Sequence, residues 1–490
     1  MKDTETCWAS CIECKGLGKK KRRLRKSIRL RYQRELAQFD ASAGNGAAPV
    51  RPIAPLDVCS TCKGSGLVAV SESPHPDKAQ YPHIAIIGGG IGGIALGVAC
   101  LHRKIPFTLY ERDQSFDARS QGYGLTLQQA SAAMKGLGVS ALAEGVVSTK
   151  HVVHTTEGKI LGEWGMRKWL AADEANKLKK SNIHIARQSL RSTLIKQLGG
   201  SEKIHWGHQL IDFNARNDSP IELKFEVNGI QKTAKADLVV GADGIRSRVR
   251  NLVIGEKISP LNYLGCIVIL GICPLKSLEG LAHPLLDSAT VFQTANGHER
   301  IYIMPYTKDS IMWQLSFPLE EEAAKSLSRK GAKALKKEAC KRVQWHDPIP
   351  QILAATSVDF ISGYPVYDRA LLQSDLLENA KQATLIGDAA HPMSPFKGQG
   401  ANQAILDALA LAREITKGCS PKSEWRKNGI RSTVLTAFES EMLARTSIKV
   451  KESATAAQFL HSEAVLQESD APRGRHLKSE RVIEDIYAKH

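Results

Sequence analysis

The chain has 490 residues, enough for two or three domains, and its 42% hydrophobic and 24% charged residues are typical of a globular protein. Its apolar runs are shorter than the roughly 18 residues that span a bilayer, and its first residues lack the apolar segment of a secretory signal. These features argue against a membrane-spanning or secreted protein, and we expect a cytoplasmic one with a formal net charge of +17.

Five of the 10 cysteines lie in the first 62 residues. Residues 11–18 and 59–66 are two copies of C-x-x-C-x-G-x-G, in which four thiolates can bind one tetrahedral Zn²⁺ and the glycines allow tight turns. The motif is similar to the cysteine-rich zinc domain of DnaJ-type chaperones. We therefore predict a zinc-binding region over residues 1–70, and the alternative is a set of reduced cysteines without structure. The expected ligands are Cys11, Cys14, Cys59 and Cys62.

A basic run lies between the two cysteine motifs. Residues 19–34 contain ten basic side chains and no acid, a pattern expected of a basic helix. Such a block indicates a nucleic-acid or other acidic partner, or a nuclear import signal. A solvated helix without a partner fits equally well. Residues 71–82, rich in Ser and Pro, read as a linker to the rest of the chain.

A strand–helix–strand pattern follows the linker. We predict a strand over residues 83–87, a helix over 92–103 and a second strand over 106–110, the opening of a dinucleotide-binding fold. The turn between the first strand and the helix reads G-x-G-x-x-G. In such a turn the first glycine permits the tight bend, the second lets the backbone approach a pyrophosphate, and the third lets the helix pack closely on the sheet. These glycines are Gly88, Gly90 and Gly93, and Glu111, at the end of the second strand, can accept hydrogen bonds from an adenosine ribose.

Short strand-like runs dominate the middle of the chain, and the fold class is therefore α/β with a β-rich second domain. We expect helices near residues 400–415 and 430–465 and a polar tail after them. The predicted division gives residues 83–205, 236–260 and 380–420 to a Rossmann-like cofactor domain, 206–235 and 261–379 to a β-rich substrate domain, and 421–490 to C-terminal helices and a tail.

Two later motifs distinguish an FAD-binding protein from an NAD-binding one. Residues 236–250 (ADLVVGADGIRSRVR) and 384–402 (TLIGDAAHPMSPFKGQGAN) each end a strand and enter a turn. With the glycine turn, they make the chain resemble the para-hydroxybenzoate hydroxylase-like flavoprotein monooxygenases over about residues 82–460. Three stretches are most similar to the tetracycline-inactivating members: YERDQSFDARSQGYGLTL at 110–127, WQLSF at 313–317 and PFKGQGANQ at 395–403.

The resemblance implies the cofactors FAD and NADPH or NADH, and it assigns roles to single residues. Asp388 would hydrogen-bond the ribityl chain of FAD, and Arg187 would reach its ribityl-phosphate region. Asp243 and Gly244 would serve both cofactors. The remaining matches are Arg112, Arg119 at a position linked to nicotinamide binding, Gly400 and Ala401, whereas Thr126 replaces a flavin-contacting acid.

The last turn supports a flavin site on physical grounds as well. Residues 398–400 (GQG) permit close backbone approach, and the helix beginning near Ala401 would direct its N-terminal amides at the negative charge of reduced flavin. Lys397 stands where relatives often have an apolar residue, and it would add positive charge there or point to solvent.

The implied reaction hydroxylates an electron-rich aromatic or enolic small molecule with NAD(P)H and O2, through a flavin C4a-hydroperoxide. The cofactor supplies this chemistry while the protein orients the substrate and excludes water, so no fixed catalytic residues are assigned. His391 is a candidate general base, although a histidine there also fits simple packing beside the flavin loop.

Two other interpretations stay open. One is a different flavoprotein on the same fold, a reductase or a halogenase; the W-x-W-x-x-P signature expected of a halogenase is missing from the sequence. The other is a zinc-dependent protein that binds nucleic acid or a client protein, with the flavin domain as a redox sensor.

Overall fold

The computed structural model describes residues 6–42, 48–52, 54–118, 123–165, 182–214, 220–420 and 423–472. One large unit contains a parallel five-stranded sheet in the order β12-β6-β5-β16-β22. Its strands are short and almost wholly buried, which explains their apolar sequences. The bounds are β5 Ile84–Ile87, β6 Phe107–Tyr110, β12 Ile204–His205, β16 Leu238–Gly241 and β22 Ala383–Leu385.

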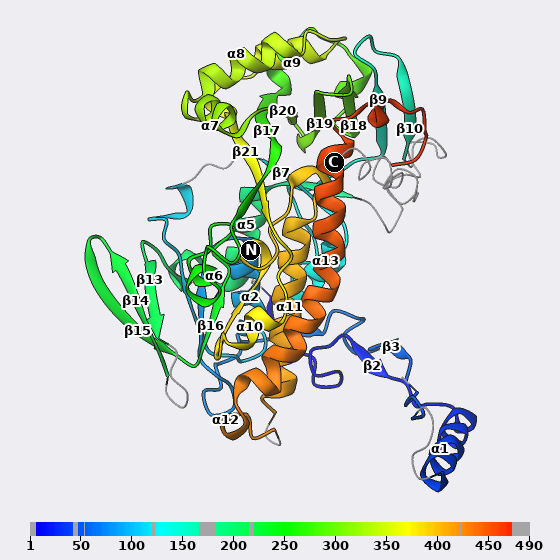
Figure 1. The fold of residues 1–490 in the computed structure, drawn as a ribbon, viewed down its shortest axis with the longest axis vertical. Helices are drawn as coiled ribbons and strands as arrows, with labels where there is room; N and C mark the ends of the chain where they lie inside the picture. Colours follow the sequence, from blue (N-terminus) through cyan, green and yellow to red (C-terminus); the bar gives the residue numbers. More distant parts are fainter. Residues whose placement is uncertain are drawn as a thin grey trace.

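Helix α2 (Ile91–Leu101) packs on this sheet, and α5 (Arg187–Leu198) and α11 (Gly400–Gly418) pack against α2. Nearly every residue of α2 is buried, because α5 and α11 contact it on either side. The predicted strand–helix–strand opening is confirmed to within two residues at each boundary. The long helix α13 (Thr436–Phe459) runs beside α11 over much of its length (Figure 1).

A second, mixed sheet of seven strands has the order β10-β9-β18-β19-β20-β17-β21. Helices α7 (Glu321–Arg329), α8 (Ala332–Arg342) and α9 (Ile349–Ala355) cover one of its faces and share an apolar core with it (Figure 1). The other face is turned toward the first unit. The strands are β9 Lys150–His154, β10 Ile160–Trp164, β17 Leu261–Pro274, β18 Thr290–Ala295, β19 Arg300–Thr307, β20 Ser310–Pro318 and β21 Ile361–Arg369.

The strands are distributed differently from the predicted segments. β9 and β10 join the seven-stranded sheet, although residues 83–205 were expected in the cofactor domain. Residues 206–235 form much of a separate three-stranded sheet, β13 (Gln209–Asn214), β14 (Ile221–Val227) and β15 (Ile230–Ala236). Alternate residues of β14 are buried in the core of the first unit, so this sheet extends that unit.

Smaller elements complete the two units. β7 (Gly124–Leu127), β8 (Val146–Val147) and β11 (Ile183–Ala186) form a three-stranded sheet. The short helices are α3 (Ala130–Met134), α6 (Arg248–Val253), α10 (Asp375–Glu378) and α12 (Trp425–Asn428). In the described part of the chain, no helix is long and apolar enough to cross a membrane.

The N-terminal region is a small knuckle made of two strand pairs. β1 (Cys7–Ser10) pairs with β4 (Leu67–Val70), and β2 (Lys19–Lys21) pairs with β3 (Leu56–Val58). The predicted basic helix exists as α1 (Lys26–Ala41), which buries none of its residues and projects away from the rest of the molecule (Figure 1).

Candidate cofactor and substrate cavity

A cavity of about 1150 Å³ lies between the five-stranded and the seven-stranded sheets. Pockets for small ligands are usually about 300–1,000 Å³, so this one has room for more than one molecule. Its wall includes the N-terminal residues of α2 and of α11, and the opposite wall is the open face of the seven-stranded sheet. The positive ends of two helices therefore meet one cavity, an arrangement suited to phosphate and to a reduced flavin.

The glycine turn is shaped by close backbone contacts. Gly88 has φ +111°, and a Cβ atom there would lie 2.5 Å from the carbonyl oxygen of Ala242. A Cβ atom on Gly93 would lie 1.9 Å from the carbonyl oxygen of Gly88. On Gly90 it would meet nothing nearer than the Arg187 guanidinium, at 4.0 Å, so the space beside Gly90 is cavity. Gly88 and Gly93 are thus required by the fold, and Gly90 leaves room for a ligand.

Glu111 is tied to the same turn. Its carboxylate accepts hydrogen bonds from the amide of Gly89, at 2.6 Å, and from the amide of Asp113, at 3.0 Å. The side chain is buried at the end of β6. Glu111 is not among the residues that line the cavity, so its contact with a ribose stays a prediction, while the two amides hold the carboxylate in place.

Arg187 and Asp388 lie on the cavity wall, as does Thr126. Arg187 begins α5, and its guanidinium lies 5.5 Å from the centre of the Tyr123 ring. Asp388 is exposed to the cavity, and enclosure by the cavity walls raises its pKa against the opposing effects of His391 and Arg187. The Thr126 hydroxyl pairs with His184 Nδ1 at 3.0 Å.

The other predicted cofactor residues are spread more widely. Asp243 supports the start of helix α6, accepting hydrogen bonds from the hydroxyl of Ser247, the N-cap residue, and from the Arg248 amide, whereas the neighbouring Gly244 lines the cavity. Arg112 is exposed, and Arg119 lies outside the described residues. Gly400, Ala401 and Lys397 line the cavity beside Asp388.

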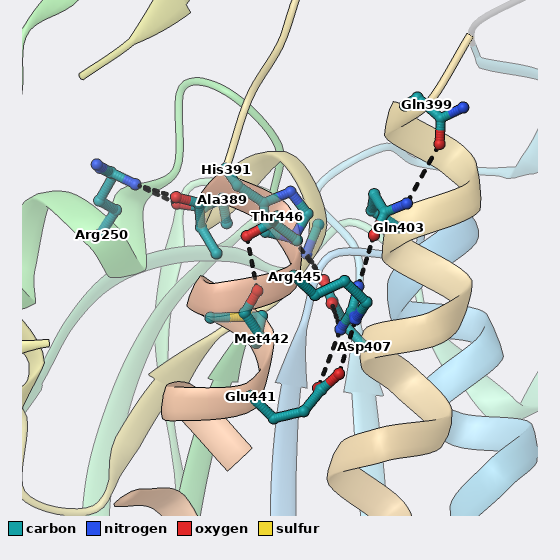
Figure 2. A network of polar contacts seen from close by, with 12 residues as sticks. Arg250, Ala389, His391, Gln399, Gln403, Asp407, Glu441, Met442, Arg445 and Thr446 are labelled. Carbon is teal, nitrogen blue, oxygen red and sulfur yellow. Dashed lines mark hydrogen bonds and ion pairs between the residues drawn. The ribbon is translucent and has the colours of Figure 1, made fainter. Parts of the chain in front are cut away.

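The loop that carries Asp388 is held from two sides (Figure 2). From one side, Arg250 donates to the carbonyl oxygens of Ala389 and Ala390 at 2.9 and 2.8 Å. From the other, Asp407 of α11 accepts hydrogen bonds from the Gly387 amide at 2.8 Å and contacts His391 Nε2 at 2.6 Å. His391 is thus buried against Asp407, and it is not among the residues that line the cavity. This geometry favours packing over the role of general base.

Asp407 was not predicted from the sequence, although an acid within the apolar stretch at 404–412 (AILDALALA) is a signal that could have found it. Arg445 of α13 completes its surroundings with a 2.9 Å ion pair, and Gln403 bridges Arg445 to Gln399 (Figure 2). Burial acts to raise the pKa of Asp407, but His391, Arg445 and the Gly387 amide outweigh it and hold the pKa below its usual value. The carboxylate is therefore ionised at neutral pH.

Replacing Asp407 by asparagine should lower the free energy of unfolding by about 3–5 kcal/mol at pH 7, because it leaves the buried partners of the carboxylate without their counter-charge. The folded-state pKa lies below the unfolded value, so the stability from ionisation is present above about pH 4 and is lost as the pH falls through the folded pKa. Urea unfolding from pH 7 to pH 3 checks this. A difference in unfolding free energy between wild type and variant that stays the same from pH 7 to pH 3 would contradict this prediction.

The wall opposite the cofactor side carries residues that sequence reasoning also missed. Gln293, Tyr302 and Gln314 are aligned across β18, β19 and β20, and Arg300 lies two residues before Tyr302 on the same strand. Apolar side chains, among them Leu270, Met304 and Met312, surround this polar row. Only the strand register brings these residues together, and although Gln314 lies in the WQLSF stretch, nothing in that stretch indicates a cavity.

The four predicted cysteine ligands do converge. The sulfurs of Cys11, Cys14, Cys59 and Cys62 all lie within 4.8 Å of one another, with Cys14–Cys62 at 3.6 Å and Cys11–Cys59 at 4.0 Å. Sulfurs around a tetrahedral Zn²⁺ lie about 3.8 Å apart, and a disulfide would need about 2.05 Å. The amides of Gly18 and Gly66 donate to the sulfurs of Cys14 and Cys62. The donor set and its spacing fit Zn²⁺.

The knuckle is packed onto the first unit. The Ser10 amide and hydroxyl both donate to the carbonyl of His102 at the end of α2. The side chains of Arg103 and of Arg413, from α11, donate to the carbonyl of Gly16, two residues after Cys14. Arg103 is 2% exposed, and both arginines lie beside the turn that carries Cys14. Two cations thus stand beside a site that would be anionic with four thiolates.

Comparisons with known proteins agree with this geometry. A family model described as "FAD binding domain" matches residues 82–423. The chain is 30% identical to the aurachin C monooxygenase/isomerase of Stigmatella aurantiaca over 67% of this chain and 79% of that protein. It is 27% identical to the zeaxanthin epoxidase of Solanum lycopersicum over 74% of this chain, but it spans only 52% of that longer protein.

Solved structures share the fold at low identity. The Klebsiella pneumoniae HpxO structure with FAD and uric acid has a TM-score of 0.66 and 17% identity, covering 84% of this chain and 97% of that one. The tetracycline destructase Tet(51) has a TM-score of 0.55 and 18% identity, covering 84% of this chain and 97% of that one. The predicted α/β fold of the para-hydroxybenzoate hydroxylase type is therefore confirmed.

Proposed function

Because the chain belongs to the family with this FAD-binding domain and is an FAD-dependent monooxygenase, we propose that it hydroxylates an aromatic or enolic small molecule with NADPH or NADH and O2. The observation that carries the proposal is the single cavity that joins two helix N-termini to an apolar wall with a polar row. When bound, FAD would supply hydride acceptance and oxygen activation there. The protein would bind the substrate, orient it and exclude water from the cavity.

The residues of the first unit would hold the flavin. The turn at Gly88–Gly90 and the N-terminus of α2 would take the pyrophosphate, and Arg187 lies beside that path. Asp388 would accept hydrogen bonds from ribityl hydroxyls, and the amides at the start of α11 would face the charge of the reduced ring. The seven-stranded sheet would close the cavity over the substrate and exclude water.

The activity test is oxidation of NADPH and of NADH by the FAD-loaded chain with phenols, quinones and tetracyclines. A substrate should raise the rate, and product formed under ¹⁸O2 should gain one labelled oxygen atom. Oxidation coupled to a reduced product without label would indicate a reductase instead. Label from water, or no stimulation by any member of these classes, would count against the proposal.

Asp388→Ala should weaken FAD binding about 10- to 100-fold, since a hydrogen bond to a charged group contributes about 1.5–3 kcal/mol. The fluorescence of FAD released on dilution measures this. Asp309→Ala, in an exposed turn, is the matched control and should bind FAD like wild type. If Asp388→Ala binds FAD as tightly as wild type, the Asp388 carboxylate takes no part in cofactor binding.

We propose further that the knuckle binds one Zn²⁺ through Cys11, Cys14, Cys59 and Cys62. The role is structural, because four thiolates leave no open coordination position. The docking contacts at Ser10 and Gly16 support a knuckle that stabilises the flavin unit. A nucleic-acid or other acidic partner of the exposed basic helix α1 stays a prediction.

A further inference from the structure

We propose that the cavity is built for a substrate with an anionic oxygen, a carboxylate or an ionised enol, which binds to Arg300 on the far side from the flavin. The inference rests on the proposed function and narrows its substrate class. It depends on the position, the partners and the surroundings of one buried arginine.

Arg300 reaches the cavity from the first residue of β19. Its Nε donates to Gln293 Oε1 at 2.7 Å, and its guanidinium carbon lies 4.9 Å from the centre of the Tyr302 ring. Among the described residues, no protein acceptor is recorded for its two terminal nitrogens and no carboxylate pairs with it. Arg300 is nevertheless buried, because only 5% of its surface is exposed.

Two other buried arginines have more hydrogen-bond acceptors than Arg300. Arg250, 2% exposed, donates to two carbonyl oxygens and to the Ser259 hydroxyl. Arg369 pairs with Glu256 and donates to two carbonyl oxygens as well. Arg300 has one neutral acceptor and faces open cavity. A buried cation with unused donors is costly unless a ligand supplies the acceptor.

The surroundings of Arg300 favour an anion over a neutral polar group. Burial lowers the pKa of Arg300 to about 10, which still leaves it charged at neutral pH. Burial raises the pKa of Tyr302 to about 12 despite the nearby Arg300, so its hydroxyl stays protonated and can donate. Gln293 and Gln314 stand on the same face. A planar guanidinium beside a phenol suits a carboxylate or an enolate oxygen.

The position also sets the geometry of the substrate. Arg300 and Asp388 both line the cavity but belong to opposite walls, one on the seven-stranded sheet and one on the flavin loop. An anionic oxygen on Arg300 would leave the rest of an aromatic or enolic molecule among Leu270, Met304 and Met312, between the arginine and the flavin side. The electron-rich ring would then face the cofactor.

The test uses the FAD-loaded full chain and two pairs of probes at pH 7.5. The carboxylate pair is 1-hydroxy-2-naphthoate and 1-naphthol, and the enolate pair is 4-hydroxycoumarin and 4-methoxycoumarin. Binding is measured from the change in the flavin visible spectrum. Charge-assisted hydrogen bonds contribute about 1.5–3 kcal/mol, so the anion of at least one pair should bind about 10-fold or more tighter than its neutral partner. Which pair shows it distinguishes the carboxylate from the enolate.

Three variants make the outcome specific. Arg300→Gln should abolish the preference for the anion while still binding 1-naphthol, Arg300→Lys should keep part of it, and Arg426→Gln, at an exposed arginine, should keep all of it. FAD content of each variant controls for folding. Equal binding within both pairs in wild type, no binding of any anion at about 1 mM, or a preference that survives in Arg300→Gln would overturn the inference. Because binding is read without NADPH, such a failure is separate from a failure of the monooxygenase activity.

Discussion

The Gly90→Ala variant is expected to fold normally and to lose FAD. The backbone of Gly90 (φ −78°, ψ −174°) suits alanine, and the new methyl group would lie 4.0 Å from the nearest protein atom. That methyl group would instead occupy the path of the pyrophosphate, where close backbone approach is required. We expect FAD affinity to fall at least about 100-fold, or about 2.7 kcal/mol. Titration of the stripped protein with FAD, followed by flavin fluorescence, measures the change.

Gly93→Ala is the matched contrast. Its methyl group would be only 1.9 Å from the Gly88 carbonyl oxygen, so the backbone must shift, and overpacking of this kind costs about 1–3 kcal/mol or more. This variant should lower the melting temperature of the flavin-free chain, whereas Gly90→Ala should leave it unchanged. Normal FAD binding by Gly90→Ala would mean that the pyrophosphate does not pass this turn.

Removing the knuckle metal should have the second large effect. Purified protein should contain about one Zn²⁺ per chain, and Cys59→Ser should contain little, because three thiolates bind a structural zinc less tightly than four. The unfolding temperature of the flavin unit should then fall by about 2–4 °C for each kcal/mol lost. The reason is that the knuckle packs on the flavin unit through Ser10 and Gly16. The buried Arg103 would also lose the anionic zinc site beside it.

Cys7→Ser is the control for this experiment, since Cys7 lies in the same region but outside the four-cysteine cluster. It should keep both the zinc and the unfolding temperature of wild type. Elemental analysis and differential scanning calorimetry give the two readings. Protein that purifies without metal, together with a Cys59→Ser variant as stable as wild type, would contradict the zinc site.

The cofactor side of this molecule could be predicted from local sequence motifs. The strand–turn–helix around Gly88–Gly93 could be predicted because its glycines have a recognisable local spacing, although Gly88 is also required by its contact with the distant Ala242 carbonyl oxygen. The cysteine cluster was predictable for a similar reason, since each C-x-x-C pair is one tight turn. The hydrogen bond from the Arg248 amide at the start of α6 to Asp243 was not predicted, because Asp243 was assigned only to cofactor binding.

The substrate side could not be predicted in the same way. Arg300, Tyr302 and Gln314 face one cavity only because the register of β19 and β20 aligns them. The placement of β9 and β10 in the seven-stranded sheet depends on pairing with β18, far along the chain. Such pairings follow from packing over the whole sheet, which a single sequence does not display.

The flavin content of the purified chain tests the central claim most directly. Denaturing the protein, then separating and quantifying the released flavin, should give about one FAD per chain and little FMN, because the cavity extends from the Gly88–Gly90 turn to the start of α11. The Gly90→Ala variant, prepared in parallel, should release almost none. A wild-type chain that purifies colourless and takes up no added FAD would contradict the account.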